Sequence, residues 1–150
     1  MMKNLYEDDW ERTVDVLCKG ALNCIGATLE GMLARGRGHI VTISSNTGRK
    51  VFPGLAVYSG SKFFVEALSQ GLRLETAGTG LKVTTIQPGD VATDLLALSE
   101  DEEALERYSP PSVAQVLEPK DVAASVIHAL RQPDHVAVNE ILVEPRDEPV

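Results

Sequence analysis

The chain has 150 residues, enough for one domain of ordinary size. It carries 14 Lys and Arg against 22 Asp and Glu, a net charge of −8, which argues against a broad phosphate-binding surface and so against a nucleic-acid partner. No stretch approaches the roughly 18 apolar residues of a membrane span, and residues 1–10 lack the apolar core of a signal peptide, so we expect no membrane partner.

The distribution of charge and the two cysteines indicate the kind of surface and the cellular compartment. Residues 94–150 carry a net charge of −9 and residues 1–93 one of +1, which we interpret as a solvated acidic surface on the second part. Cys18 and Cys24 lie six apart in a helical pattern and so face different ways, which disfavours a mutual disulfide. The sequence therefore favours a reducing compartment, and we expect the chain in the cytoplasm.

The first part of the chain predicts two long helices and one strand. Apolar side chains recur every three or four residues over 8–34, which indicates a long helix, and Gly36 to Gly38 end it. The β-branched run 39–43 predicts a buried strand, and residues 44–53 form a polar loop. A second helix is predicted over about 55–77, ended by Gly78-Thr79-Gly80.

The rest of the chain predicts two more strands and two more helices. Residues 82–87 indicate a strand, and residues 100–108 indicate a short helix before the Pro110-Pro111 break. Residues 120–131 indicate a helix with Pro119 in its first turn, and residues 138–143 indicate a last strand. Strands separated by helices imply right-handed crossovers and a parallel sheet, so we predict an α/β fold in one domain over 1–150. Three strands make a thin sheet, because such sheets normally carry helices on both faces.

Three side chains could carry chemistry: Ser45, Tyr58 and Lys62. Tyr58 and Lys62 lie four apart near a helix start and share a face, and Ser45 follows the first strand at the edge where open α/β sheets bind ligands. A nearby ammonium favours the phenolate and lowers the phenol pKa, which would let Tyr58 exchange a proton with an alcohol or carbonyl oxygen. A Ser hydroxyl could hold that oxygen. By spacing alone, a Tyr beside a solvated Lys explains the pair equally well.

Longer segments around these residues resemble a known family. The segments Gly38 to Ser45, Tyr58-Ser59-Gly60-Ser61-Lys62 and Ile86 to Thr93, preceded by Asp9-Trp10-Glu11-Arg12 and Asp15 to Gly20, are similar to the classical short-chain dehydrogenase/reductase family. The resemblance runs from about residue 7 to residue 144. Within the family, residues 38–93 look most like members that oxidise hydroxy acids or other small alcohols with NADP.

The resemblance implies a role for each matched residue. Tyr58 would be the general acid/base, Ser45 would orient the substrate oxygen, and Lys62 would lower the Tyr58 pKa and hold the nicotinamide ribose. The residues bordering the nicotinamide would be Pro88, Gly89, Val91 and Thr93. The implied reaction is hydride transfer between NADP or NAD and the carbon of a small alcohol or carbonyl compound. The implied fold is part of a Rossmann-like, doubly wound parallel sheet that lacks its N-terminal βαβ units.

Two departures from the family bear on activity. The 150 residues contain no Gly-x-x-x-Gly-x-Gly turn and no Asn-Asn-Ala-Gly segment, which would bind the adenosine and pyrophosphate, so we expect this chain alone to bind the cofactor poorly. The family's Asn, which holds a water in the proton relay to the Lys, is replaced by Leu17. Leucine has no polar atom, so we expect a weakened relay.

Three hypotheses remain open on function. The chain could be a truncated oxidoreductase, a catalytically inactive derivative that acts by binding, or a small enzyme that assembles its cofactor site between subunits. We expect homo-oligomers, or pairing with a full-length relative, through helices 8–34 and 55–77, which form the subunit interface in many family members. His39, His128 and His135 have no metal-ligand spacing, so we predict no metal site.

Overall fold

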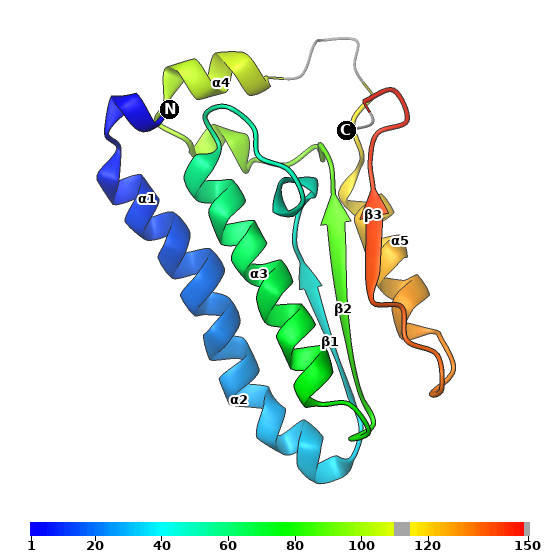
Figure 1. The fold of residues 1–150 in the computed structure, drawn as a ribbon. Coiled ribbons are helices and arrows are strands. Elements are labelled where there is room, and N and C mark those ends of the chain that lie inside the picture. Colours follow the sequence, from blue (N-terminus) through cyan, green and yellow to red (C-terminus); the bar gives the residue numbers. More distant parts are fainter. Residues whose placement is uncertain (110–114, 149–150) are drawn as a thin grey trace.

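The fold is a small parallel sheet with helices on both sides (Figure 1). The computed structural model describes residues 1–109 and 115–148. Strands β1 (Gly38–Ile43), β2 (Leu81–Pro88) and β3 (Glu140–Val143) lie in the order β1-β2-β3, and both pairings are parallel. Ile86 of β2 lies beside Ile43 on one side and Ile141 on the other. This confirms the predicted α/β class and the partial Rossmann-like sheet.

A single long helical segment forms the outer layer. It comprises α1 (Glu7–Val14), a π turn over Asp15–Lys19 and α2 (Gly20–Arg35), and it ends at Gly36, whose φ of 62° is the left-handed conformation that glycine adopts without a Cβ clash. The predicted helix over 8–34 is therefore confirmed. The π turn was not predicted, because its residues fit the same apolar spacing as the rest of the helix.

Helix α3 (Ala56–Glu75) lies between the outer helix and the sheet (Figure 1). It contacts α1 and the π turn on one side and β2 on the other. Helix α5 (Pro119–Leu130) lies behind β3, on the other side of the sheet, and begins with Pro119 at its first position, as predicted. Helices therefore cover both faces, as a doubly wound sheet requires.

The remaining elements differ from prediction mainly at their ends. Helix α4 (Glu102–Tyr108) begins after Asp101, whose side chain accepts a hydrogen bond from the backbone N–H of Ala104. Strand β3 starts two residues later than predicted, because the carbonyl of Val138 accepts a hydrogen bond from the Thr84 hydroxyl instead of entering the sheet. The predicted break at residues 110–111 lies outside the described residues.

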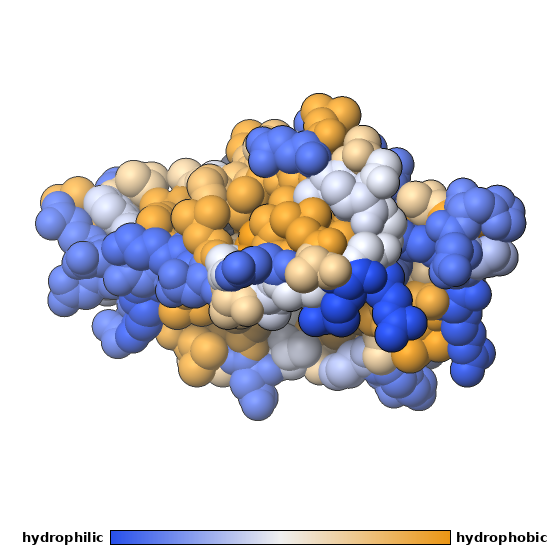
Figure 2. All heavy atoms as spheres, turned by 90° about the horizontal axis from the view of Figure 1, so that it is seen from below, coloured by the Kyte–Doolittle hydropathy of each residue, from blue (hydrophilic) through white to orange (hydrophobic). Residues whose placement is uncertain are grey.

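The buried core is small and centres on β2. The apolar side chains buried there and on α3 are Val65, Leu72, Val83 and Ile86, whereas α1, the π turn and α2 contain no buried residue. An apolar groove runs between α2, α3 and β1, whose outer edge has no neighbouring strand among the described residues. At the lower end of the molecule, apolar side chains gather in the middle with hydrophilic ones around them (Figure 2).

The segment Glu7–Arg35 is long and apolar enough to cross a membrane, by length and composition only. This finding differs from the expectation that no stretch approaches the length of a membrane span. In the fold, this segment contacts α3 along the outer layer, as a covering helix of an α/β sheet does.

Candidate active site

Ser45 lies directly after β1, at the carboxyl edge of the sheet. The backbone N–H of Ser44 donates to the carbonyl of Ile86, 2.7 Å away, which continues the pairing of β1 with β2 past Ile43. Ser45 then begins a short 3-10 turn over Asn46–Gly48, and its Oγ accepts a hydrogen bond of 3.1 Å from the N–H of Thr47. The side chain is 7% exposed. Its hydroxyl is therefore held in place at the edge where ligands of open α/β sheets bind.

Tyr58 and Lys62 project from the first two turns of α3 toward the same place. The Lys62 Nζ lies 5.5 Å from the centroid of the Tyr58 ring, within the range of a cation–π contact. The same Nζ donates to the carbonyl of Ile43, 3.1 Å away, just before Ser45. The fold thus brings together Ser45, Tyr58 and Lys62, the three residues that the sequence singled out.

The electrostatics of Tyr58 differ from the prediction. Burial raises the pKa of the phenol above its ordinary 10.0, and the neighbouring Ser45 side chain opposes this rise without cancelling it. The net direction is thus opposite to the lowering expected from Lys62, because loss of water around the phenol outweighs the Ser45 hydrogen bond, and the contribution of Lys62 itself stays a prediction. Burial also lowers the pKa of Lys62, and the charge of Glu66 works against that effect.

The segment after β2 reaches the same edge of the sheet. Pro88 ends β2 beside Val143, and the N–H of Gly89 donates to the Val143 carbonyl at 2.8 Å. Val91 bridges to Leu117, and the Thr93 hydroxyl accepts a hydrogen bond from the N–H of Leu95 at 3.4 Å. The four residues assigned to the nicotinamide therefore lie at the end of β2 or after it, and β2 neighbours β1, the strand that precedes Ser45.

Leu17 lies within the π turn of the outer helix. It is half-buried, and the π turn contacts α3, the helix that carries Tyr58 and Lys62. π turns are inserted into helices most often at functional sites. The residue that stands at the family's Asn position therefore lies in an irregular turn of a segment that contacts α3, yet its side chain can neither donate nor accept a hydrogen bond.

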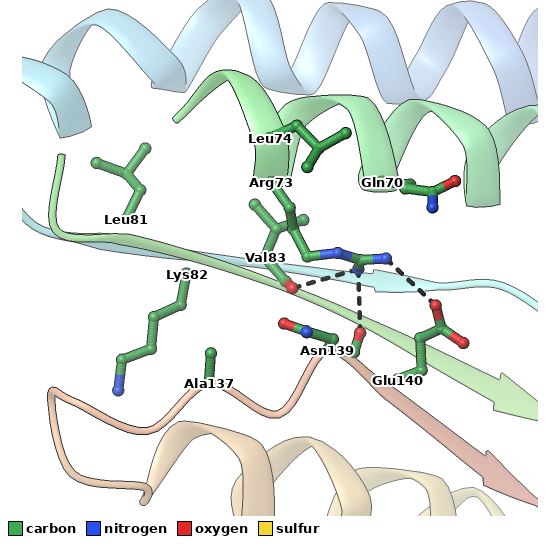
Figure 3. A pocket seen from close by; sticks show the side chains of 9 residues that line it. All are labelled: Gln70, Arg73, Leu74, Leu81, Lys82, Val83, Ala137, Asn139 and Glu140. Atoms are coloured by element: carbon green, nitrogen blue, oxygen red, sulfur yellow. Dashed lines mark hydrogen bonds and ion pairs between the residues drawn. The ribbon is translucent and has the colours of Figure 1, made fainter. Parts of the chain in front are cut away.

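A hollow at the opposite end of the sheet is distinct from this site (Figure 3). Arg73 of α3 points across it toward β2 and β3 and donates to the carbonyls of Val83 and Asn139 and to the carboxylate of Glu140. These contacts use the guanidinium of Arg73, so this side chain is not free to bind an anionic ligand in the hollow. It lies at the amino end of the strands, away from Ser45, so we assign it a structural role.

Two further residues near the site were not singled out from the sequence. Glu66, one turn after Lys62, accepts a hydrogen bond of 3.2 Å from Thr85 Oγ1 and belongs to the same helix face as Lys62. Gly48 ends the turn that carries Ser45, and a Cβ there would lie 3.1 Å from Glu66 Cγ. The four-residue spacing of Glu66 from Lys62 was a signal available in the sequence, whereas the close approach at Gly48 was not.

The residues present fit the nicotinamide end of a dinucleotide. Lys62 has three N–H donors and uses one on Ile43, so it has capacity for ribose hydroxyls, and the Tyr58 phenol lies beside it. The chemistry of these donors suits uncharged hydroxyl groups. The Gly-rich turn that would take the pyrophosphate does not occur in the 150 residues.

Comparison with known proteins identifies the family. The profile of the short chain dehydrogenase family matches residues 1–104. The chain is 67% identical over 150 residues to the glycine betaine reductase ATRR of Emericella nidulans, covering all of this chain and 12% of that protein. It is 41% identical over 138 residues to an uncharacterized oxidoreductase of Staphylococcus aureus (strain MW2), covering 92% of this chain and 55% of the relative.

Solved structures agree with this assignment. The closed form of a serine dehydrogenase complexed with NADP+ superposes with a TM-score of 0.89 at 31% identity, covering 99% of this chain and 60% of that one. A 3-oxoacyl-[acyl-carrier protein] reductase with bound NAD from Brucella melitensis gives a TM-score of 0.72 at 26% identity, covering 92% and 51%. The chain thus spans little more than half the length of these relatives and a smaller share of the betaine reductase. By its profile match and its relatives, the chain belongs to the short-chain dehydrogenase/reductase family of oxidoreductases.

Proposed function

We propose that the chain carries the catalytic part of an NAD(P)(H)-dependent oxidoreductase that interconverts a small alcohol and its carbonyl compound. The observation that carries this proposal is the convergence of Ser45, Tyr58 and Lys62 at the carboxyl edge of the sheet, with Lys62 Nζ 5.5 Å from the Tyr58 ring. The names of two relatives, a serine dehydrogenase and a glycine betaine reductase, favour small compounds related to amino acids as substrates.

Each residue has a distinct task in this proposal. Tyr58 would donate a proton to the carbonyl oxygen in reduction and accept it from the alcohol in oxidation. The Ser45 hydroxyl would hold that oxygen as it gains negative charge. The ammonium of Lys62 would stabilise the phenolate and hold ribose hydroxyls. NADP or NAD, when bound, supplies the hydride chemistry, with Pro88, Gly89, Val91 and Thr93 beside its nicotinamide.

The proposal is tested by hydride transfer from a large excess of NADPH or NADH to a set of small aldehydes, which compensates for weak binding by this chain. We expect turnover by the wild-type chain and a loss of about 10²- to 10⁴-fold in Tyr58→Phe, the range that positioned proton transfer contributes. Tyr6→Phe, at the start of α1, is the matched control and should keep full activity. Equal turnover in Tyr58→Phe and wild type would refute the role of Tyr58.

A second candidate function is binding without catalysis. Leu17 at the relay position favours it. Absence of turnover in wild type and in Tyr58→Phe, with both chains folded, would favour this candidate over the first. The cytoplasmic location that the two cysteines indicate stays a prediction under either candidate.

The partner under either candidate would be a second copy, or a full-length relative, joined through the outer helix and α3. Large apolar side chains are exposed on these helices, among them Val16 (65%), Phe63 (43%) and Phe64 (36%). Burying them would be favourable by about 25 cal/mol per Å² of apolar surface. Light scattering of the purified chain should give twice the 16.2 kDa of one chain, and Val16→Glu should return it to one; a wild-type monomer would exclude self-association.

A further inference from the structure

A carboxylate that the proposed reaction does not use lies next to the active-site lysine. Glu66 follows Lys62 by one helical turn on α3, so the two side chains share a face. Glu66 Oε2 accepts the hydrogen bond from Thr85 Oγ1, a side chain of β2 with 0% exposure. Glu66 Oε1 is buried and has no hydrogen-bond partner among the described residues. A carboxylate in such a place costs free energy unless its charge is compensated.

Lys62 is a buried group of the opposite charge, and its charge is also incompletely compensated. Its side chain is 7% exposed, and among the described residues its ammonium has a single hydrogen-bond partner, the neutral carbonyl of Ile43. Among those residues no ion pair joins Lys62 to Glu66, so the two charges act on each other through space along one helix face. Two incompletely satisfied groups of opposite charge, one turn apart in a site of low water content, stabilise each other's charged form.

The other charged groups of the surrounding elements are engaged elsewhere. Arg49, after the turn that carries Ser45, donates to the Gln87 side chain of β2 at 3.1 Å and lies 3.9 Å from Glu140 of β3. In the π turn, Asp15 pairs with Lys19. Burial lowers the pKa of Lys62, and the charge acting in the opposite direction is that of Glu66.

Glu66 also touches the turn that carries Ser45. A Cβ at Gly48 would lie 2.9 Å from Ser44 Oγ, 3.1 Å from Glu66 Cγ and 3.2 Å from the Lys62 carbonyl. The aliphatic stem of Glu66 thus packs against the turn after β1, while its carboxylate lies beside β2. Glu66 therefore contacts the turn that positions Ser45 and lies one helical turn from Lys62 on α3.

We propose that Glu66 is a positioning residue of this site: its carboxylate, held by Thr85, keeps the buried Lys62 protonated. The role of Glu66 rests on the proposed function, because the charged ammonium of Lys62 is the group that would stabilise the Tyr58 phenolate. The electrostatic claim itself is a property of the chain and needs no turnover to be measured.

The test is a pH titration of Lys62 followed by NMR on lysine labelled with ¹³C at Cε, with its signal assigned through Lys62→Arg among the six lysines. We expect Glu66→Gln to shift the titration midpoint of Lys62 downward from the wild-type value. Glu75→Gln removes a charge at the exposed end of the same helix and should leave the midpoint in place. Thr85→Val removes the hydrogen bond but keeps the carboxylate, so it should not produce the shift of Glu66→Gln.

Two arms keep the proposal falsifiable if Glu66→Gln does not fold. Glu66→Met, which has a side chain of similar length and no charge, is the second charge-free variant and should shift the titration midpoint of Lys62 downward as Glu66→Gln does. Glu66→Asp keeps the carboxylate. It should therefore leave the titration midpoint of Lys62 above the midpoint measured in a variant without this charge, such as Glu66→Met. An unchanged Lys62 midpoint in a folded charge-free variant of Glu66 would overturn the proposal, and this result would not bear on the Tyr58 assay.

Discussion

Lys62 Nζ lies 5.5 Å from the centre of the Tyr58 ring and donates to the carbonyl of Ile43, the last residue of β1. This relationship joins the catalytic helix to the strand that carries Ser45. It places a buried ammonium beside a buried phenol, and burial shifts both groups toward their neutral forms. Both groups therefore favour their neutral forms more strongly than they would in water.

The first prediction concerns stability. In a Glu66→Gln background, which has no buried carboxylate for Lys62 to compensate, replacing the buried ammonium by an apolar side chain of similar length in Lys62→Met should raise the free energy of unfolding at neutral pH by about 1 kcal/mol, although Ile43 loses a hydrogen bond. Because the folded-state pKa of Lys62 lies below its ordinary 10.5, the unfolded chain binds more protons between these two values. In that background, the stability of the chain with Lys62 therefore rises relative to Lys62→Met as the pH approaches 10.5.

Urea unfolding at several pH values measures this difference. The gain in Lys62→Met should be fully present below the folded-state pKa of Lys62 and should shrink above it. A pH-independent loss of stability in Lys62→Met would contradict the account, because it would mean that Lys62 contributes packing and hydrogen bonding rather than a desolvated charge.

The second prediction concerns the pH dependence of the reaction. Since burial raises the Tyr58 pKa above 10.0, the phenol is protonated at neutral pH and suited to donate its proton. Carbonyl reduction should be nearly constant between about pH 6 and 8, whereas alcohol oxidation, which needs the phenolate, should rise with pH throughout that range. Initial rates in both directions measure this. An oxidation rate that falls with rising pH would exclude the phenol as the base.

The third prediction concerns the proton relay. Leu17→Asn restores a polar side chain in the π turn and should raise turnover by roughly tenfold, a part of what positioned proton transfer contributes. It should also lower the free energy of unfolding by about 1 kcal/mol, because a half-buried apolar side chain is lost. Leu22→Asn, at a position 46% exposed on the same outer helix, is the control. An equal effect of both variants on turnover would rule out a specific relay at residue 17.

The fourth prediction uses a pair of glycines. In Gly48→Ala the new methyl group would lie 2.9 Å from Ser44 Oγ, so the turn that carries Ser45 must move, at a cost of about 1–3 kcal/mol. In Gly71→Ala, inside α3, the methyl group meets nothing within 4 Å and should stabilise the helix by about 0.5–1 kcal/mol. Thermal unfolding of both variants provides the measurement. If Gly48→Ala were as stable as Gly71→Ala, the close packing of this turn would be disproved.

Much of the fold followed from the sequence because its signals are local. The apolar spacing of 8–34, the β-branched run before Ser45 and Pro119 each predict their element from neighbouring residues. The π turn at residues 15–19 could not be predicted, because it changes the hydrogen-bond register without changing the spacing of apolar residues. Strand β3 was predicted two residues too long, because a side chain of a different strand, Thr84, competes for the Val138 carbonyl.

The sequence predicted which residues form the site, but not the direction in which the pKa of Tyr58 is shifted. The family motifs located Ser45, Tyr58 and Lys62, and the fold brings them together. The direction of the Tyr58 pKa depends on how much water the folded chain removes, which no spacing encodes. Glu66 and Gly48 become visible as partners only when β2 and the turn after β1 are placed against α3.

The most direct test of the central claim is calorimetric titration of the purified chain with NADPH and with reduced nicotinamide mononucleotide, which lacks the adenosine half. Because the residues present fit the nicotinamide end and the 150 residues hold no Gly-rich phosphate turn, we expect both ligands to bind with similar, weak affinity. Lys62→Met should weaken both. Absence of saturable binding of either ligand to the folded chain would contradict the account and favour a protein that acts by binding a partner.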